Sequence, residues 1–277
     1  MNSFLPTFCH SVSTSQKITS YFWPGPLTII LQKRDIIPDI VSAGHDTIAL
    51  RCPEHHIFRE ILQNFQLPLA APSANPFGYI SPTTADQVRS TLGDKVDIII
   101  DGGNCRVGLE STIIDITSHI PKILRPGAIT AAEIARVINE PVMDYEQHIV
   151  AIDPSCPGQL KQHYCTNTKL ILFQHATLPQ SSNDTHCAYV FNQKPINIEE
   201  ISNTLNTTTE SIFWMSEDGN HKTIAHNLFK MLQMLDNANY DIIYCERTLR
   251  NGIGIAIDDR LLRAAAKFND HNHNQQH

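Results

Sequence analysis

Hydroxyl and guanidinium side chains recur at the ends of apolar runs in the first half of the chain. Arg51 closes one such run, Ser111 opens another, and Arg125 ends a third. Ser73 follows the run Leu67–Ala71, which we expect to be buried. Ligands of open α/β sheets collect outside strand ends, and hydroxyls with guanidiniums suit phosphate or carboxylate oxygens. Taken singly, each Ser could be a turn former and each Arg a solvated charge. The recurrence of these side chains at the ends of apolar runs favours a pocket that binds an anion, and it does not specify which anion.

Several other chemistries lack sequence support. The chain has no G-x-x-x-x-G-K-[ST] loop, no H-E-x-x-H helix and no G-x-S-x-G elbow, and no Cys-His pair suggests a nucleophile. Its seven cysteines are odd in number and form no C-x-x-C pair, so we expect reduced thiols and no metal site. No catalytic residue can therefore be named.

The composition of the chain disfavours some classes of binding partner. The 277 residues include 21 Lys and Arg against 28 Asp and Glu, a net charge of −7 with neutral His. Such a chain is no general binder of nucleic acid, so we expect weak or no direct nucleic-acid binding. No apolar run is long enough for a membrane span, and no signal peptide is evident. We expect a cytoplasmic protein without membrane contact.

Apolar periodicity predicts alternating strands and helices, which indicates the α/β class. In the first half we expect strands at residues 27–31, 47–51, 96–100, 111–116 and 123–125, and helices at 54–65, 84–92 and 130–139. The last helix carries a capping box, Thr130 to Glu133. In the second half we expect strands at 170–173, 188–191, 212–215 and 242–245, with a helix between the last two and a final one over 258–267.

These elements divide the chain into four parts. We expect a first domain over residues 1–143, a linker over 144–168, a smaller domain with a parallel sheet over 169–268, and a disordered tail over 269–277. The tail HNHNQQH is polar and of low complexity, which is typical of a disordered terminus.

Seven motifs in fixed order resemble the two-domain form of the YrdC-like L-threonylcarbamoyladenylate synthases. They are Tyr21–Thr28, Ala71–Asn75, Ser81–Thr83, Glu110–Asp115, Leu124–Ile129 and Gly254–Leu261, with Pro157–Tyr164 between the last two. The resemblance implies a twisted YrdC-like sheet with helices, followed by a Rossmann-like domain. It also implies synthesis of threonylcarbamoyl-AMP and pyrophosphate from L-threonine, bicarbonate and ATP. The product would pass to a tRNA-modifying transferase complex that acts on the adenosine beside the anticodon.

The same resemblance assigns roles by motif. Arg51 and Ser111, with the backbone of Ala71, would hold L-threonine. ATP, as a complex with Mg²⁺, would contact four side chains: Thr47, Ser73, Ser81 and Arg125. At the linker position where some relatives carry a Tyr that contacts nucleotide, this chain has Lys161. Catalysis of this kind rests on positioning and charge neutralisation.

One departure from the family pattern concerns the start of the domain. The sequence lacks a T-x-T-V-Y-G-L-like strand and a K-x-R pair before the Tyr21–Thr28 motif. We therefore expect an N-terminally incomplete catalytic domain, with a sheet edge and a core face uncovered. The alternative function is a catalytically impaired remnant that binds nucleotide or tRNA-modification partners.

Overall fold

The computed structural model describes residues 9, 13–145, 162–174, 177–179 and 186–269. Their contacts form two compact units, residues 1–72 with 110–147 and residues 73–109 with 148–277. The helices are α2 Ser13–Phe22, α3 Asp39–Ser42, α4 His56–Phe65, α5 Ala85–Leu92, α6 Ala131–Ile138, α7 Ile198–Thr204, α8 His221–Asp236 and α9 Gly254–Asn269, with short 3₁₀ turns η2 Gly93–Lys95 and η3 Thr209–Ser211. The strands are β1 Leu27–Gln32, β2 Thr47–Arg51, β3 Thr112–Asp115, β4 Lys122–Arg125, β5 Lys169–Phe173, β6 Cys187–Gln193, β7 Ile212–Ser216 and β8 Ile242–Glu246.

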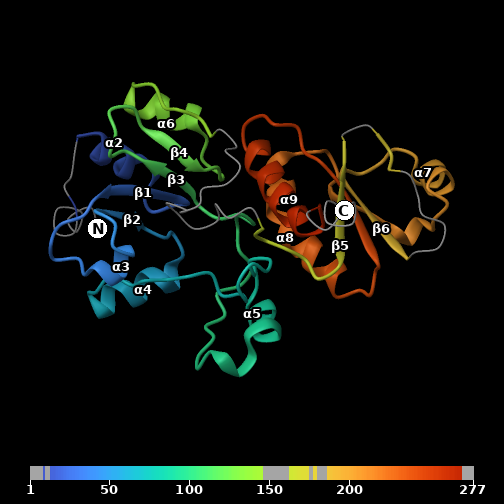
Figure 1. The fold of residues 1–277 in the computed structure, drawn as a ribbon, viewed down its shortest axis with the longest axis horizontal. Coiled ribbons are helices and arrows are strands. Elements are labelled where there is room, and N and C mark those ends of the chain that lie inside the picture. Colours follow the sequence, from blue (N-terminus) through green and yellow to red (C-terminus); the bar gives the residue numbers. More distant parts are fainter. Residues whose placement is uncertain (1–8, 10–12, 146–161, 175–176, 180–185, 270–277) are drawn as a thin grey trace, which may run out of the picture. The chain divides into compact units, whose positions relative to one another are not determined.

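The first unit contains a mixed sheet of strand order β2-β1-β3-β4 (Figure 1). Strand β1 is antiparallel to β2 and parallel to β3, while β3 and β4 are antiparallel. Apolar side chains of β1 and β3 pack with those of α2 and α6 in one cluster that includes Ile18, Leu27, Ile114 and Ile134. This sheet, with the parallel sheet of the second unit, confirms the α/β fold class predicted from the sequence.

Helix α6 shows how capping residues determine where a helix begins and ends. The Thr130 hydroxyl accepts a hydrogen bond from the Glu133 backbone N–H (3.2 Å), and the Glu133 carboxylate accepts one from the Thr130 N–H (2.8 Å). Asn139 ends the helix in the left-handed conformation, with φ of 58°. The predicted capping box and the predicted end of the helix are confirmed.

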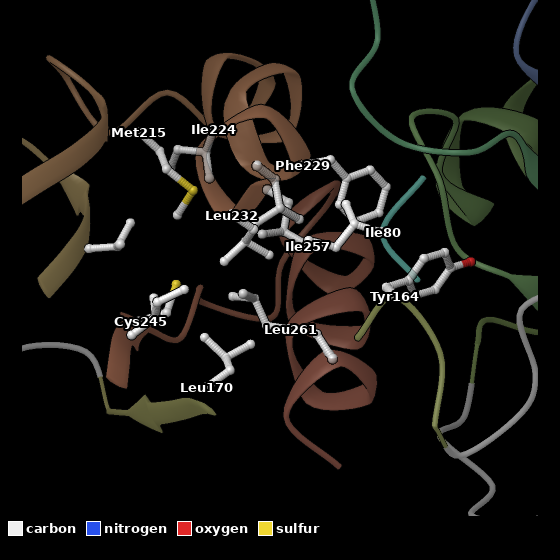
Figure 2. Close-up of a cluster of buried hydrophobic side chains, with 14 of the residues drawn as sticks. Ile80, Tyr164, Leu170, Met215, Ile224, Phe229, Leu232, Cys245, Ile257 and Leu261 are labelled. Atoms are coloured by element: carbon white, nitrogen blue, oxygen red, sulfur yellow. The ribbon is translucent and has the colours of Figure 1, made fainter. Parts of the chain in front are cut away.

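The second unit contains a fully parallel sheet of order β5-β8-β6-β7. Helices α8 and α9 cover one face, where Leu170, Met215, Leu232 and Leu261 lie in one buried cluster (Figure 2). The opposite face packs against α7. The predicted Rossmann-like parallel sheet is therefore confirmed.

Residues 73–109 pack within the second unit. Ile80 is fully buried in the cluster of α8 and α9 (Figure 2). The Tyr79 hydroxyl donates to the Asp236 carboxylate at the end of α8 (2.6 Å), and the Cys165 N–H donates to the Gly78 carbonyl (2.8 Å). A Cβ at Gly108 would overlap the backbone of α8, so this approach requires glycine. The domain boundaries predicted from the sequence stay a prediction; much of the linker, Lys161 included, and most of the tail lie outside the described residues.

Two predictions about apolar runs are wrong, one of a strand over residues 96–100 and one of a buried run over Leu67–Ala71. Residues 96–100 form no strand, and the side chains of Ile98 and Ile100 are 80% and 59% exposed. The run Leu67–Ala71 is irregular and exposed rather than buried. Among the described residues neither segment belongs to a sheet. The side chains of a strand point out of the plane of its sheet, so an apolar run is buried only where a sheet holds it against a covering layer.

Candidate functional site

The side chains of Ser111 and Arg125 are joined by several hydrogen bonds in the first unit. The Arg125 guanidinium donates from Nε and Nη2 to the Ser111 carbonyl oxygen (3.1 and 3.0 Å), and from Nη2 to the Ser111 hydroxyl (3.1 Å). The Ser111 hydroxyl also shares a hydrogen bond of 2.7 Å with the Thr28 hydroxyl. Ser111 is buried, so these partners fix its position.

The strand register brings Arg51 to the same group. Arg51 lies directly opposite Thr28 across the β1–β2 ladder. Residues opposite each other on neighbouring strands point to the same face of a sheet, so Arg51 lies beside Thr28. The starts of β1 and β3 and the ends of β2 and β4 thus form one edge of the sheet, which carries Arg51, Ser111 and Arg125.

Thr28 is a member of this edge that we did not select from the sequence. It lies in the Tyr21–Thr28 motif, and its hydroxyl and the Arg125 guanidinium both form hydrogen bonds with the Ser111 hydroxyl. A polar residue in the otherwise apolar run 27–31 was the signal that could have revealed it.

The turn after β4 holds Arg125 in place. A Cβ at Gly127 would overlap the backbone and hydroxyl of Thr112, so the close packing of this turn requires glycine. The Thr112 hydroxyl donates to the Ile129 carbonyl (2.6 Å) and accepts from the Ile129 N–H (3.1 Å). These contacts fix the chain on both sides of the Arg125–Ser111 pair.

Two further predicted residues of the first unit lie away from this edge. Thr47 shares the face of Arg51, because alternate residues of a strand point the same way, but it stands at the other end of β2, about 13 Å along the strand. Ala71 lies in the exposed segment after α4. A ligand touching Thr47 and the edge would have to extend along β2.

Ser73 and Ser81 belong to the second unit, and the edge just described concerns the first unit alone. Ser73 is exposed and Ser81 half-buried. Between them, the Asn75 side-chain amide donates to the carbonyls of Pro76 and Tyr79 (both 3.0 Å), which shapes the loop. The roles of these two serines stay a prediction.

The edge suits anion binding better than nucleophilic chemistry. Cys52 follows Arg51 directly, and burial raises the pKa of its thiol, which keeps it protonated at neutral pH. Among the described residues, no group of three His, Cys, Asp or Glu could hold a metal ion. None of the described helices is long and apolar enough to cross a membrane.

A mixed sheet with two guanidiniums at one edge, in a chain that continues into a parallel-sheet unit, defines an α/β protein of two units. Comparison with known proteins makes the class specific. A sequence family described as "Telomere recombination" matches residues 5–127, and one described as "Threonylcarbamoyl-AMP synthase, C-terminal domain" matches residues 129–266. The chain belongs to the threonylcarbamoyl-AMP synthase family.

Comparison with individual proteins supports the same family membership. The chain is 32% identical over 252 residues to the threonylcarbamoyl-AMP synthase of Pyrococcus abyssi, covering 91% of this chain and 73% of that one. It is 32% identical over 248 residues to the Bacillus subtilis enzyme of the same name, covering 88% and 70%. The crystal structure of P. abyssi Sua5 complexed with L-threonine matches 93% of this chain and 76% of that one, with a TM-score of 0.78 and 29% identity.

Proposed function

We propose that this protein forms threonylcarbamoyl-AMP and pyrophosphate from L-threonine, bicarbonate and ATP. The observation that carries the proposal is the convergence of Arg51, Ser111 and Arg125 at one sheet edge, in a chain of the synthase family. The P. abyssi relative was solved with L-threonine, which supports the amino-acid substrate.

In this proposal Arg51 and Ser111 hold threonine. A guanidinium can bind both oxygens of the amino acid carboxylate in one plane. The Ser111 hydroxyl, held by Thr28 and Arg125, is placed to accept or donate one further hydrogen bond. The backbone of Ala71 completes the threonine contacts.

Thr47, Ser73, Ser81 and Arg125 contact ATP. The reaction joins the threonine nitrogen to the carbon of bicarbonate, with loss of water. A carbamate oxygen then bonds to the α-phosphorus while pyrophosphate leaves. Negative charge accumulates on the phosphate oxygens. The Arg125 guanidinium is already held in place, so it stabilises this charge without having to reorient. Mg²⁺ enters as part of the ATP substrate, because Mg²⁺ bound to nucleotides draws most of its ligands from phosphates and water.

The product has a mixed anhydride that transfers its acyl group readily, so a transferase that modifies tRNA adenosine is the partner we propose downstream. This chain need not bind tRNA itself, in keeping with its net charge of −7. With the family, we place the reaction in the cytoplasm.

A second candidate function is an impaired remnant that binds nucleotide without turnover. Helix α4 favours it: apolar residues repeat along one face of this helix, yet none of its side chains is buried. Leu67 and Leu69, which follow α4, are 63% and 49% exposed. Uncovered apolar surface of this extent is typical of an interaction site or a destabilised fold, which fits a protein that binds nucleotide or partners without turnover.

Pyrophosphate release from ATP separates the two functions. We expect pyrophosphate release to require both threonine and bicarbonate. The assay should compare this chain with a longer chain that begins at any upstream start. Arg125→Lys removes the guanidinium fork. It should lower kcat/KM about 10–100-fold, because losing one charge-assisted hydrogen bond in the transition state has an effect of this size. Arg136→Lys, exposed on α6, is the matched control. Nucleotide binding with no turnover in either length of chain would establish the remnant instead.

A further inference from the structure

A short turn, residues 23–26, leads from the end of α2 into β1, and we call it the entry turn. Strand β1 lies between β2 and β3 in the sheet of the first unit. The entry turn is therefore next to both strands that carry the proposed threonine contacts. Arg51 is the last residue of β2, and Ser111 directly precedes β3.

The entry turn binds the residue that directly follows each of these two threonine contacts. The Gly25 N–H donates to the carbonyl oxygen of Cys52, after the end of β2 (2.8 Å). The Pro26 carbonyl oxygen accepts from the N–H of Thr112, at the start of β3 (3.1 Å). Cys52 and Thr112 are both buried, so losing either hydrogen bond would leave a buried polar group without its partner.

Two features hold the entry turn in one conformation. The Trp23 Nε1–H donates to the Leu27 carbonyl oxygen (2.8 Å), a hydrogen bond that joins the first residue of the turn to the first residue of β1. A Cβ at the buried Gly25 would overlap the Phe22 carbonyl oxygen, so the close packing of the turn requires glycine. The Trp23 ring packs against the apolar cluster of the first sheet. The ring is therefore anchored, and its N–H closes the turn.

We propose that the entry turn sets the separation of Arg51 and Ser111, and through it the affinity for the amino acid substrate, with Trp23 as the positioning residue. The role of Trp23 rests on the proposed function, in which Arg51 and Ser111 contact threonine. The paired stretches of β2 and β3 end at these positions, and the entry turn binds both strands there. A misplacement of about 1 Å between binding groups can cost about 100-fold in rate, so a small shift of this turn has a measurable effect.

The competing explanation is that the entry turn only stabilises the fold. A purely structural residue changes the fraction of folded protein, which lowers the apparent kcat and the melting temperature. It leaves the threonine affinity of the folded molecules unchanged. A positioning residue changes that affinity, so the test measures affinity and folding separately.

Trp23→Phe keeps an aromatic ring in the cluster and removes the indole N–H. We expect the dissociation constant for L-threonine, measured by isothermal titration calorimetry of the full chain, to rise about 2–10-fold, the effect of losing one hydrogen bond. KM for threonine should rise by the same factor, and the affinity for ATP should change less. Trp214→Phe is the matched control, because Trp214 Nε1 also donates one hydrogen bond, to Glu217 in the second unit (2.9 Å). This control should bind threonine as the parent does.

Thermal unfolding keeps the test decisive if Trp23→Phe is less stable, because the rise in melting temperature on adding threonine still reports affinity. Parent affinity in Trp23→Phe, or an equal loss in Trp214→Phe, overturns the proposal. Pyrophosphate release by the parent tests the proposed function separately. A parent that binds threonine without releasing pyrophosphate contradicts that function alone, and the affinities of the two variants still decide the role of Trp23. A parent that binds no threonine contradicts both.

Discussion

The hydroxyl groups of Thr28 and Ser111 lie 2.7 Å apart, although 83 residues separate them in the chain. The parallel pairing of β1 with β3 brings them together at the starts of these two strands. Ser111 thereby has one polar partner on each side, Thr28 and Arg125. The position of a residue assigned to threonine binding thus depends on a residue in a different motif.

Replacing Thr28 with Val should weaken threonine use more than ATP use. The change keeps the shape of the side chain and removes a hydrogen bond worth about 0.5–1.5 kcal/mol. We expect KM for threonine to rise about 2–10-fold in the pyrophosphate-release assay, with KM for ATP changing less. Thr204→Val, at an exposed position on α7, is the control. An equal rise in both constants would show that Thr28 does not position Ser111 for threonine.

Ile80→Ala should destabilise the second unit. Ile80 is fully buried against α8 and α9, and truncation of such a residue costs about 2–5 kcal/mol. Urea unfolding measures this loss. Ile98→Ala, in the same 73–109 segment but 80% exposed, should change the free energy of unfolding by less than about 0.5 kcal/mol. Equal effects would mean that the segment does not pack with the C-terminal unit.

The second unit should lose stability in alkaline solution. Burial, and then the neighbouring Cys187, raise the pKa of Tyr189 to about 12 from an ordinary value of 10.0. The neutral phenol therefore contributes stability that is fully present below pH 10 and is lost as the pH rises toward 12. We expect a loss of up to about 2 kcal/mol over that interval, measured by urea unfolding. Tyr189→Phe should flatten the pH dependence; an unchanged slope would assign the effect to other groups.

The cysteines should differ widely in reactivity. Cys105 is exposed, whereas Cys245 is fully buried and burial raises the pKa of its thiol. With iodoacetamide at pH 8, peptide mass spectrometry should find Cys105 alkylated at least about 100-fold faster than Cys245, because the exposed thiolate is the reactive form. Cys105→Ser removes this fast modification as a control. Comparable rates at both sites would mean that the second unit opens readily.

Local patterns in the sequence were sufficient for many elements. The capping box at Thr130 and Glu133 predicted the start of α6, since capping involves residues three positions apart. The repeat of Ile224, Leu228 and Leu232 predicted the buried face of α8, since it follows the period of one helix. These signals depend on neighbouring residues, which the sequence displays directly.

Local patterns failed where burial depends on a distant partner. Residues 96–100 carry an apolar run typical of a strand, yet Ile98 is 80% exposed. The run shows that the segment can pair, and a strand forms only where another strand supplies the ladder hydrogen bonds.

The sequence by itself determined the α/β class, the family, and Arg51, Ser111 and Arg125 as candidate site residues. The tertiary structure decided that these three share one sheet edge and that Thr28 joins them. It also decided that Asp258 binds both Arg247 and Arg250. Strand register and helix packing bring together residues that are far apart in sequence, and neither is encoded in local periodicity.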